Sequence, residues 1–249
     1  MWLVNRSQII NHLIKIFNYK KYLEIGVHNP IKNFDFIKCN IKHGVDPEWV
    51  AKPAPPSGPA DDFGLHSLDP RAKREIGMFT VTSDEFFENL DPIVKYDIIF
   101  IDGEHLEHQV TKDYYNSKKH LSSNGSIIFH DCNPPTAAHA SDPENELYQE
   151  VKNWNGTCYR SYINIRLSNE SIGKEMYVID TDWGVGIIRE GNQRCDYFKN
   201  HEEKMSHLNL EEMLLPGEEG FNNFAKHRKE ALNLITPEKF VELFPKIQQ

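Results

Sequence analysis

Five short apolar runs, separated by stretches long enough for helices, limit this chain to few folds. The runs are "YLEIG" (22–26), "KHGVD" (42–46), "MFTV" (78–81), "DIIFID" (97–102) and "SIIFHD" (126–131). Strands that alternate with helices at this spacing indicate βαβ units and a parallel sheet buried on both faces. Two further runs in "EMYVIDTDWGVGIIRE" (175–190) flank a tight turn. We therefore predict a doubly wound α/β fold with a mostly parallel, seven-stranded sheet and a terminal antiparallel hairpin.

Helices are predicted around this sheet and at both ends of the chain. Residues 8–17 carry apolar side chains at near-helical spacing. "TSDEFFENL" (82–90) begins with N-cap residues followed by two acids, which favour the first turn of a helix. Further helices are predicted at 105–121, 146–154, 159–167, 208–215, 221–235 and 237–244. The N- and C-terminal helices have apolar faces that could pair subunits in a homo-oligomer.

Two segments rich in proline and small residues, 47–75 and 132–145, are predicted to be loop insertions. Loops of this length are lids or segments without fixed structure, and the first is equally compatible with either. We expect a single domain over residues 1–249. Its core covers about 20–190 and a helical C-terminal extension covers 196–249.

The charge balance argues against a nucleic-acid partner. The chain has 28 Lys and Arg against 37 Asp and Glu, a net charge of -9, which would repel a phosphate backbone. Polar residues interrupt the first apolar stretch too often for a membrane span or signal peptide. The four cysteines lie far apart without a C-x-x-C pair, as is typical of a cytoplasmic protein.

Unusual residues follow the first two predicted strands. In a parallel sheet, ligands bind outside the carboxyl ends of the strands. Glu24 and Gly26 end the first strand, and His28 follows where a dinucleotide-binding loop would need more glycines. Asp46 ends the next strand, twenty positions after Gly26, a spacing that suits a carboxylate binding a ribose diol. The alternative for Asp46 is to cap the turn before Pro47.

Five motifs, taken in this order, resemble the class I S-adenosylmethionine-dependent methyltransferases. They are "YLEIGVHNPIKNFDFIKCNIKHGVDP", "TSDEFF", "IDGEH", "GSIIFHD" and "YVIDTDWGVGII". The resemblance covers roughly residues 20–190 and is closest to a macrocin-like or sugar O-methyltransferase branch. It implies a Rossmann-like methyltransferase fold that binds S-adenosyl-L-methionine. The cofactor-binding residues that it implies are Glu24, Gly26, His28, Asp46, Ser83, Asp84 and Asp102.

Acids and histidines also end the fourth and fifth predicted strands. Asp102, His130 and Asp131 would meet at one sheet edge and offer ligands for Mg²⁺, or for Mn²⁺ because of the histidine. The resemblance implies that Asp102 is catalytic as a metal ligand and that His105 is the general base. The alternatives are that Asp102 caps the next helix and that a backbone carbonyl satisfies a buried His130.

Three functions are compatible with these patterns. The first is a metal-assisted O-methyltransferase that acts on a hydroxyl of a sugar or glycan-like small molecule. The second is a metal-dependent hydrolase on a methyltransferase-like scaffold, and the third is a non-catalytic cofactor-binding subunit. The cofactor motifs favour the first over the second, and His105 favours it over the third.

Overall fold

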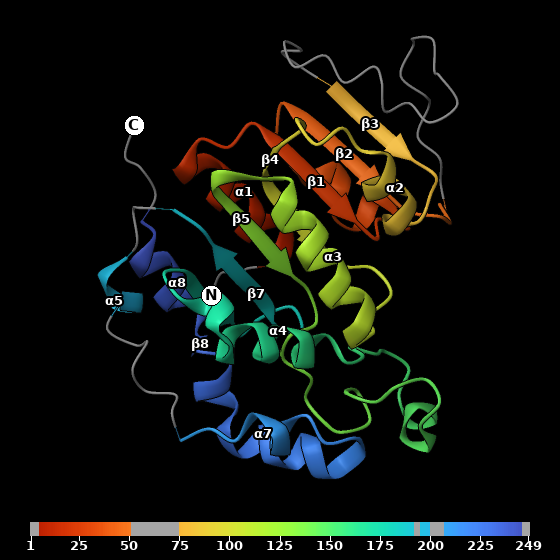
Figure 1. Cartoon of the computed structure of the whole chain (residues 1–249), viewed down its shortest axis with the longest axis vertical. Coiled ribbons are helices and arrows are strands. Elements are labelled where there is room, and N and C mark those ends of the chain that lie inside the picture. The colour runs from red at the N-terminus through yellow and green to blue at the C-terminus, as the bar shows by residue number, and fades with distance from the viewer. Residues whose placement is uncertain (1–4, 51–74, 192–194, 200–206, 246–249) are drawn as a thin grey trace.

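A computed structural model describes residues 5–50, 75–191, 195–199 and 207–245. The described strands form one eight-stranded sheet in the order β3-β2-β1-β4-β5-β7-β6-β8 (Figure 1). Their bounds are β1 Lys21–Ile25, β2 Ile41–Val45, β3 Glu75–Phe79, β4 Tyr96–Ile101, β5 Leu121–Phe129, β6 Glu175–Ile179, β7 Val185–Arg189 and β8 Leu234–Ile235. The first five strands are parallel, and β7 pairs antiparallel with both β5 and β6. The doubly wound, Rossmann-like fold predicted from the sequence is confirmed.

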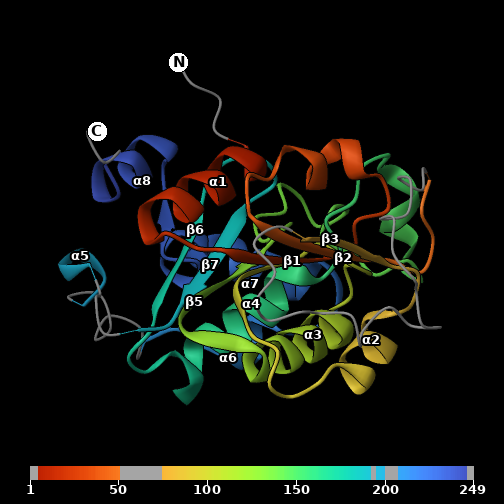
Figure 2. The ribbon, with the colours of Figure 1, turned by 90° about the horizontal axis from the view of Figure 1, so that it is seen from above.

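Helices cover both faces of the sheet, as the view from above shows (Figure 2). One face packs against α1 Arg6–Phe17 and α8 Pro237–Leu243. The other face packs against α2 Ser83–Asn89, α3 Glu107–Lys119, α4 Cys158–Leu167 and α7 Gly217–Ala231. Two short helices, α5 Asp196–Lys199 and α6 Leu210–Met213, complete the described helices. Because both faces are covered, β1, β4 and the second half of β5 are almost continuously buried.

Local sequence signals explain where two helices begin. Asn5 caps α1 and forms a capping box with Gln8, and Thr82 does the same for α2 with Glu85. Thr82 therefore takes the N-cap position predicted for this segment. The start of α2 is fixed beside the ends of β1 and β4, where a ligand pocket lies.

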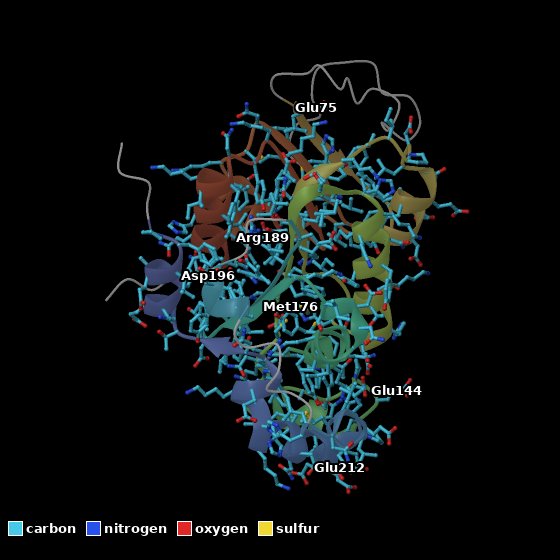
Figure 3. The ribbon with its side chains drawn as sticks, turned by 60° about the vertical axis from the view of Figure 1, so that its left-hand side comes forward. Glu75, Glu144, Met176, Arg189, Asp196 and Glu212 are labelled. Atoms are coloured by element: carbon cyan, nitrogen blue, oxygen red, sulfur yellow. The ribbon has the colours of Figure 1, made fainter. Side chains whose placement is uncertain are left out.

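A buried ion pair joins the two strands of the terminal hairpin. Glu175 on β6 lies directly opposite Arg189 on β7, and their side chains are 3.0 Å apart. Figure 3 shows Arg189 in the interior, whereas Glu144 and Glu212 lie at the periphery. A charge at this depth requires a partner, so each residue fixes the register of the other.

The structure departs from the sequence-based expectation in two segments. The segment 146–154 forms a 3₁₀-helix only over Glu146–Glu150, and irregular chain follows it. The helix predicted at 221–235 ends at Ala231, and β8 follows it as an eighth strand parallel to β6. Most of the predicted 47–75 loop lies outside the described residues, whereas 132–145 has no helix or strand, as predicted. Among the described residues, no helix is long and apolar enough to cross a membrane.

Candidate functional site

A pocket of about 880 Å³ opens at the carboxyl ends of β1, β2, β4 and β5. It lies where the chain order reverses between β1 and β4, the position at which open α/β sheets bind their ligands. All ten residues predicted for the site line this pocket: Glu24, Gly26, His28, Asp46, Ser83, Asp84, Asp102, His105, His130 and Asp131. The structure thus brings the predicted cofactor residues and the predicted metal and catalytic residues into one cavity.

The turn after β1 is held by Asp46 at the end of β2. The backbone N–H of His28 donates to Oδ2 of Asp46 at 2.8 Å, and the backbone N–H of Glu48 donates to Oδ1 at 2.7 Å. Asp46 therefore makes the turn-capping contact that was its alternative role. Each carboxylate oxygen can accept a second hydrogen bond, so these contacts also orient the carboxylate for a ligand hydroxyl.

Glu24 is a buried carboxyl at the floor of the pocket. Its Oε2 accepts hydrogen bonds from the Tyr22 hydroxyl at 2.5 Å and from the Asn33 amide at 2.9 Å. Burial raises the pKa of Glu24 to about 8, although both of these hydrogen bonds favour the ionised form. Glu24 is therefore mostly protonated at neutral pH.

The start of α2 faces α3 across the pocket. The Gln109 amide donates to Oγ of Ser83 at 3.1 Å and to Oδ1 of Asp113 at 3.2 Å. Asp84 is paired with Lys112 at 2.5 Å. Asp113 is only 1% exposed, and burial raises its pKa to about 6. The segment predicted to contact adenine is thus completed by polar residues of α3.

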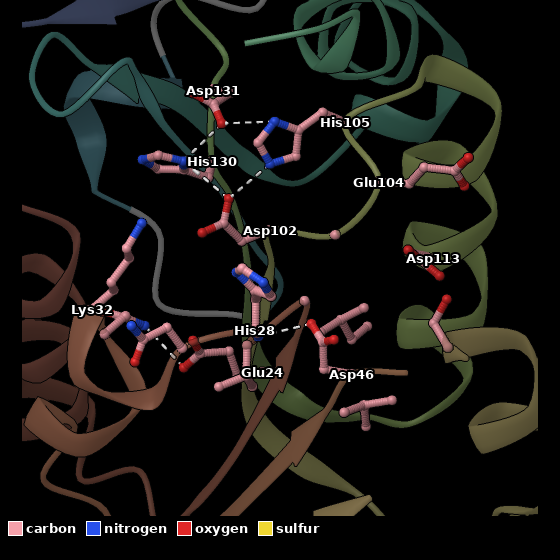
Figure 4. A pocket seen from close by; sticks show the side chains of 18 of the residues that line it. Glu24, His28, Lys32, Asp46, Asp102, Glu104, His105, Asp113, His130 and Asp131 are labelled. Atoms are coloured by element: carbon pink, nitrogen blue, oxygen red, sulfur yellow. Dashed lines mark hydrogen bonds and ion pairs between the residues drawn. The ribbon is translucent and has the colours of Figure 1, made fainter. Parts of the chain in front are cut away.

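Two carboxylates and two histidines converge at the ends of β4 and β5 (Figure 4). We call Asp102, His105, His130 and Asp131 the Asp–His cluster. His105 lies between the acids, with Nε2 3.3 Å from Asp102 and Nδ1 3.3 Å from Asp131. His130 also lies between them, with Nδ1 3.0 Å from Oδ1 of Asp102 and 2.9 Å from Oδ2 of Asp131. Glu104 is exposed and points away from the cluster in Figure 4.

Asp102 and the two histidines of the cluster shift one another's pKa in opposite directions. Burial alone would raise the pKa of Asp102, but His130 and His105 hold it well below its usual range. Burial alone would lower the pKa of His130, but Asp102 and Asp131 raise it well above its ordinary value. The pKa of His105 is raised for the same reason. Within the cluster, negative charge on the acids and positive charge on the histidines therefore stabilise each other.

The donor set fits a hard divalent cation. Asp102, His105 and Asp131 each offer a ligand atom, and these atoms all lie within 4.8 Å of one another. Carboxylate oxygens suit Mg²⁺ and Mn²⁺, and an imidazole is compatible with Mn²⁺. His130 lies equally close to the acids, so both histidines are placed where a ligand or a base would act.

The backbone at the cluster has an uncommon conformation. His105 and Asp131 have φ values of 61° and 59°, in the left-handed region that non-glycine residues rarely adopt. Such strain persists only where the surroundings impose it, and it concentrates at functional sites. Here the segment 154–157 imposes it on the turn at His105. Trp154 stacks on the His105 ring, and the backbone N–H of Thr157 donates to the His105 carbonyl at 2.9 Å.

Asn155 and Arg6 are parts of the site that the sequence did not single out. The buried Asn155 amide donates to Oδ1 of Asp131 at 2.8 Å and so orients that carboxylate. Nη1 of Arg6, at the start of α1, lies 3.3 Å from Oδ2 of Asp102. The Asn-Gly pair in "WNGT" is a turn signal that could have drawn attention to Asn155. We find no comparable signal for Arg6, which is 96 positions from Asp102.

Comparisons with known proteins found methyltransferase domains. A family model described as a methyltransferase domain matches residues 36–132, the segment that runs from before β2 to just past Asp131. No curated protein matches the chain. An O-methyltransferase from Bacillus cereus in complex with S-adenosylhomocysteine is 14% identical, with 75% of this chain and 82% of that chain covered and a TM-score of 0.45. An S-adenosylhomocysteine-bound methyltransferase from Podospora anserina is 14% identical, with 75% and 78% covered and a TM-score of 0.46.

The family match covers the ends of β2, β4 and β5, whereas the end of β1, with Glu24, Gly26 and His28, lies before it. The sheet order places these strand ends around one pocket, and the pocket contains every residue predicted for the cofactor. Over residues 36–132 the chain is thus similar to a methyltransferase domain.

Proposed function

We propose that the protein is an S-adenosylmethionine-dependent methyltransferase, that it acts on a hydroxyl of a sugar or glycan-like small molecule, and that a divalent cation assists the reaction. The observation that carries the proposal is the Asp–His cluster, which lies in the same pocket as the predicted cofactor residues. A hydroxyl is too weak an acid to lose its proton to histidine alone, so an oxygen acceptor calls for both a cation and a base. The sugar class comes from the motifs that resemble sugar O-methyltransferases.

The cofactor half of the pocket would extend from β1 to α2. Glu24 and Gly26 would line the methionine portion, with His28 beside it, and Asp46 would accept hydrogen bonds from the ribose hydroxyls. Ser83 and Asp84 would lie beside the adenine. When bound, S-adenosylmethionine supplies an electrophilic methyl group, which bonds to the acceptor oxygen as the sulfur–methyl bond breaks and S-adenosylhomocysteine leaves.

In the catalytic half, Asp102 and Asp131 would hold the cation, with His130 as the predicted third ligand. The cation would lower the pKa of the acceptor hydroxyl. His105 would accept the hydroxyl proton at a ring nitrogen. Its ring is stacked on Trp154 and its carbonyl is bound by Thr157, so the base is held in a fixed place. Because positioning can supply roughly 7–11 kcal/mol, this rigidity is part of the proposed mechanism.

Two measurements test the proposal in sequence. Isothermal titration calorimetry of S-adenosylmethionine and S-adenosylhomocysteine, with Mn²⁺ or with a chelator, should show micromolar binding of both. Incubation with methyl-labelled cofactor and a panel of sugars, nucleotide sugars, catechols and amines should then label the sugars, and a chelator should remove the label. Labelling of amines alone would exclude the hydroxyl acceptor. Labelling of catechols but not sugars would keep the oxygen chemistry and exclude the sugar class.

A further inference from the structure

Arg6, at the start of α1, brings a positive charge to the Asp–His cluster. Its Nη1 lies 3.3 Å from Oδ2 of Asp102. The same nitrogen lies 3.0 Å from Nδ1 and 2.8 Å from Nε2 of His130. One atom so close to both ring nitrogens lies over the face of the ring, because within the ring plane it would collide with the carbon between them. Arg6 therefore contacts two of the three predicted metal ligands, Asp102 and His130.

With this contact, both carboxylate oxygens of Asp102 have a polar neighbour. Oδ1 faces His105 at 3.3 Å and His130 at 3.0 Å, and Oδ2 faces Arg6. A guanidinium stays charged at any pH at which proteins are folded. A divalent cation that approaches Asp102 must therefore take the place of one of these neighbours, and it is repelled by the charge of Arg6 until it does so.

The backbone of Arg6 is anchored, and its side chain lines the pocket. Its backbone N–H donates to Oδ2 of Asp182 at 2.8 Å, and its Nε lies 3.8 Å from the same oxygen. The helix behind it is fixed in the core by Ile9, Ile10 and Leu13, which are fully buried. The Arg6 side chain is 19% exposed. The cluster therefore has a partly exposed cation at its edge, carried by a helix that is packed in the core.

We infer that Arg6 competes with a divalent cation for Asp102, so that Arg6 sets the metal affinity of the cluster. The inference rests on the metal site of the proposed function and extends it. Arg6 acts on the metal through Asp102 and His130, so it is a positioning residue.

The test is Mn²⁺ binding to the full chain, measured by electron paramagnetic resonance of the free ion. Arg6→Gln should bind Mn²⁺ at least about tenfold more tightly than the unsubstituted protein, because a repelling charge next to Asp102 is gone. Lys15→Gln is the matched control. It removes the same charge from an exposed position on α1, and its Mn²⁺ affinity should stay within about twofold of the unsubstituted value because distant surface charges are screened. Arg6→Lys, which keeps the charge, should also bind weakly.

Equal or weaker Mn²⁺ binding by Arg6→Gln would overturn the inference, and so would an equal gain in Lys15→Gln. Circular dichroism establishes that each variant is folded, and Arg6→Met replaces Arg6→Gln if the latter is not. If no variant binds Mn²⁺ at millimolar concentration, the inference and the metal site fail together. Titration of the same samples with S-adenosylmethionine then shows whether cofactor binding still stands.

Discussion

The backbone carbonyl of Asp102 occupies the space that a side chain on Gly26 would need. Gly26 follows β1 with a φ of 84°, and Asp102 follows the neighbouring strand β4. The two turns at the centre of the pocket pack directly against each other, and glycine is required for the close approach as well as for the backbone conformation. Gly26 is a predicted cofactor-binding residue. In the structure, the atoms nearest to an added Cβ belong to the turn that carries Asp102.

Gly26→Ala should therefore lower the free energy of unfolding by more than the cost of left-handed backbone alone. Gly173→Ala is the control, because Gly173 has a φ of 77° but no atom within 4 Å of its added Cβ among the described residues. The control should lose about 1–2 kcal/mol, the usual penalty of that conformation, and Gly26→Ala at least about 2 kcal/mol more. Urea denaturation measures both. If both variants lose the same free energy of unfolding, the turn that carries Asp102 moves aside at little cost.

His105→Ala should lower turnover by roughly 10²–10⁴-fold and leave the affinity for S-adenosylmethionine nearly unchanged, because a positioned base acts on the acceptor proton. His108→Ala, which changes an exposed histidine in the first turn of α3, is the control and should retain full activity. Turnover is measured as S-adenosylhomocysteine release with an acceptor that the unsubstituted protein methylates. If His105→Ala turns over as fast as the control, His105 is not the general base and acts only as a ligand or a packing residue.

Asp102→Asn should weaken Mn²⁺ binding by at least about 100-fold and abolish metal-dependent turnover, because it removes the carboxylate shared by both histidines and Arg6. Glu104→Gln removes a carboxylate two positions away that is exposed and points out of the cluster, so its Mn²⁺ affinity should match that of the unsubstituted protein. Calorimetric titration with Mn²⁺ compares the two. Asp102→Asn with full activity would refute the metal assignment.

Glu24→Gln should change how stability depends on pH. The folded-state pKa of Glu24 is raised to about 8 from an ordinary value of 4.5, so between these values the unfolded chain ionises while the folded protein does not. Stability is therefore lost as pH rises from about 4.5 to about 8. Glutamine keeps a hydrogen-bond acceptor for Tyr22 and Asn33 but cannot ionise.

The stability of Glu24→Gln relative to the unsubstituted protein should rise by roughly 1–3 kcal/mol between pH 5 and pH 8, since one pKa unit corresponds to about 1.4 kcal/mol. Urea denaturation at several pH values measures this difference. The exposed carboxylate variant Glu88→Gln should show no such trend. A flat difference for Glu24→Gln would mean that Glu24 ionises freely in the folded protein.

The fold could be predicted from the sequence because most of its strands are buried and apolar. β1, β4 and β5 coincide with the apolar runs, since a strand covered on both faces has little choice of residue. β3 lies at the edge of the sheet, is half-exposed and begins at Glu75, before the run that predicts it. β8 is only two residues long and directly follows a helix, so no periodicity distinguishes it from the end of that helix.

The site could be predicted where residues follow strands, because parallel strands bring their ends together whatever lies between them. This reasoning places Asp46, Asp102 and Asp131 in one pocket. It does not reach Asn155, because the chain before it was expected to be helical and instead turns back toward Asp131. It does not reach Arg6 either, whose contact with Asp102 depends on how α1 packs across the sheet.

The packing of α1 against α8 has a consequence for the order in which the molecule is assembled. His12 and Phe244 are 232 positions apart, and the His12 ring nitrogen lies 2.6 Å from the Phe244 carbonyl oxygen. Contacts between such distant positions form late, because a long loop must close first. During synthesis, the helix that carries Arg6 is made before Phe240 and Phe244, the residues that pack against it. The helix that places Arg6 in the pocket is therefore fully packed only after residues 240–244 have been made.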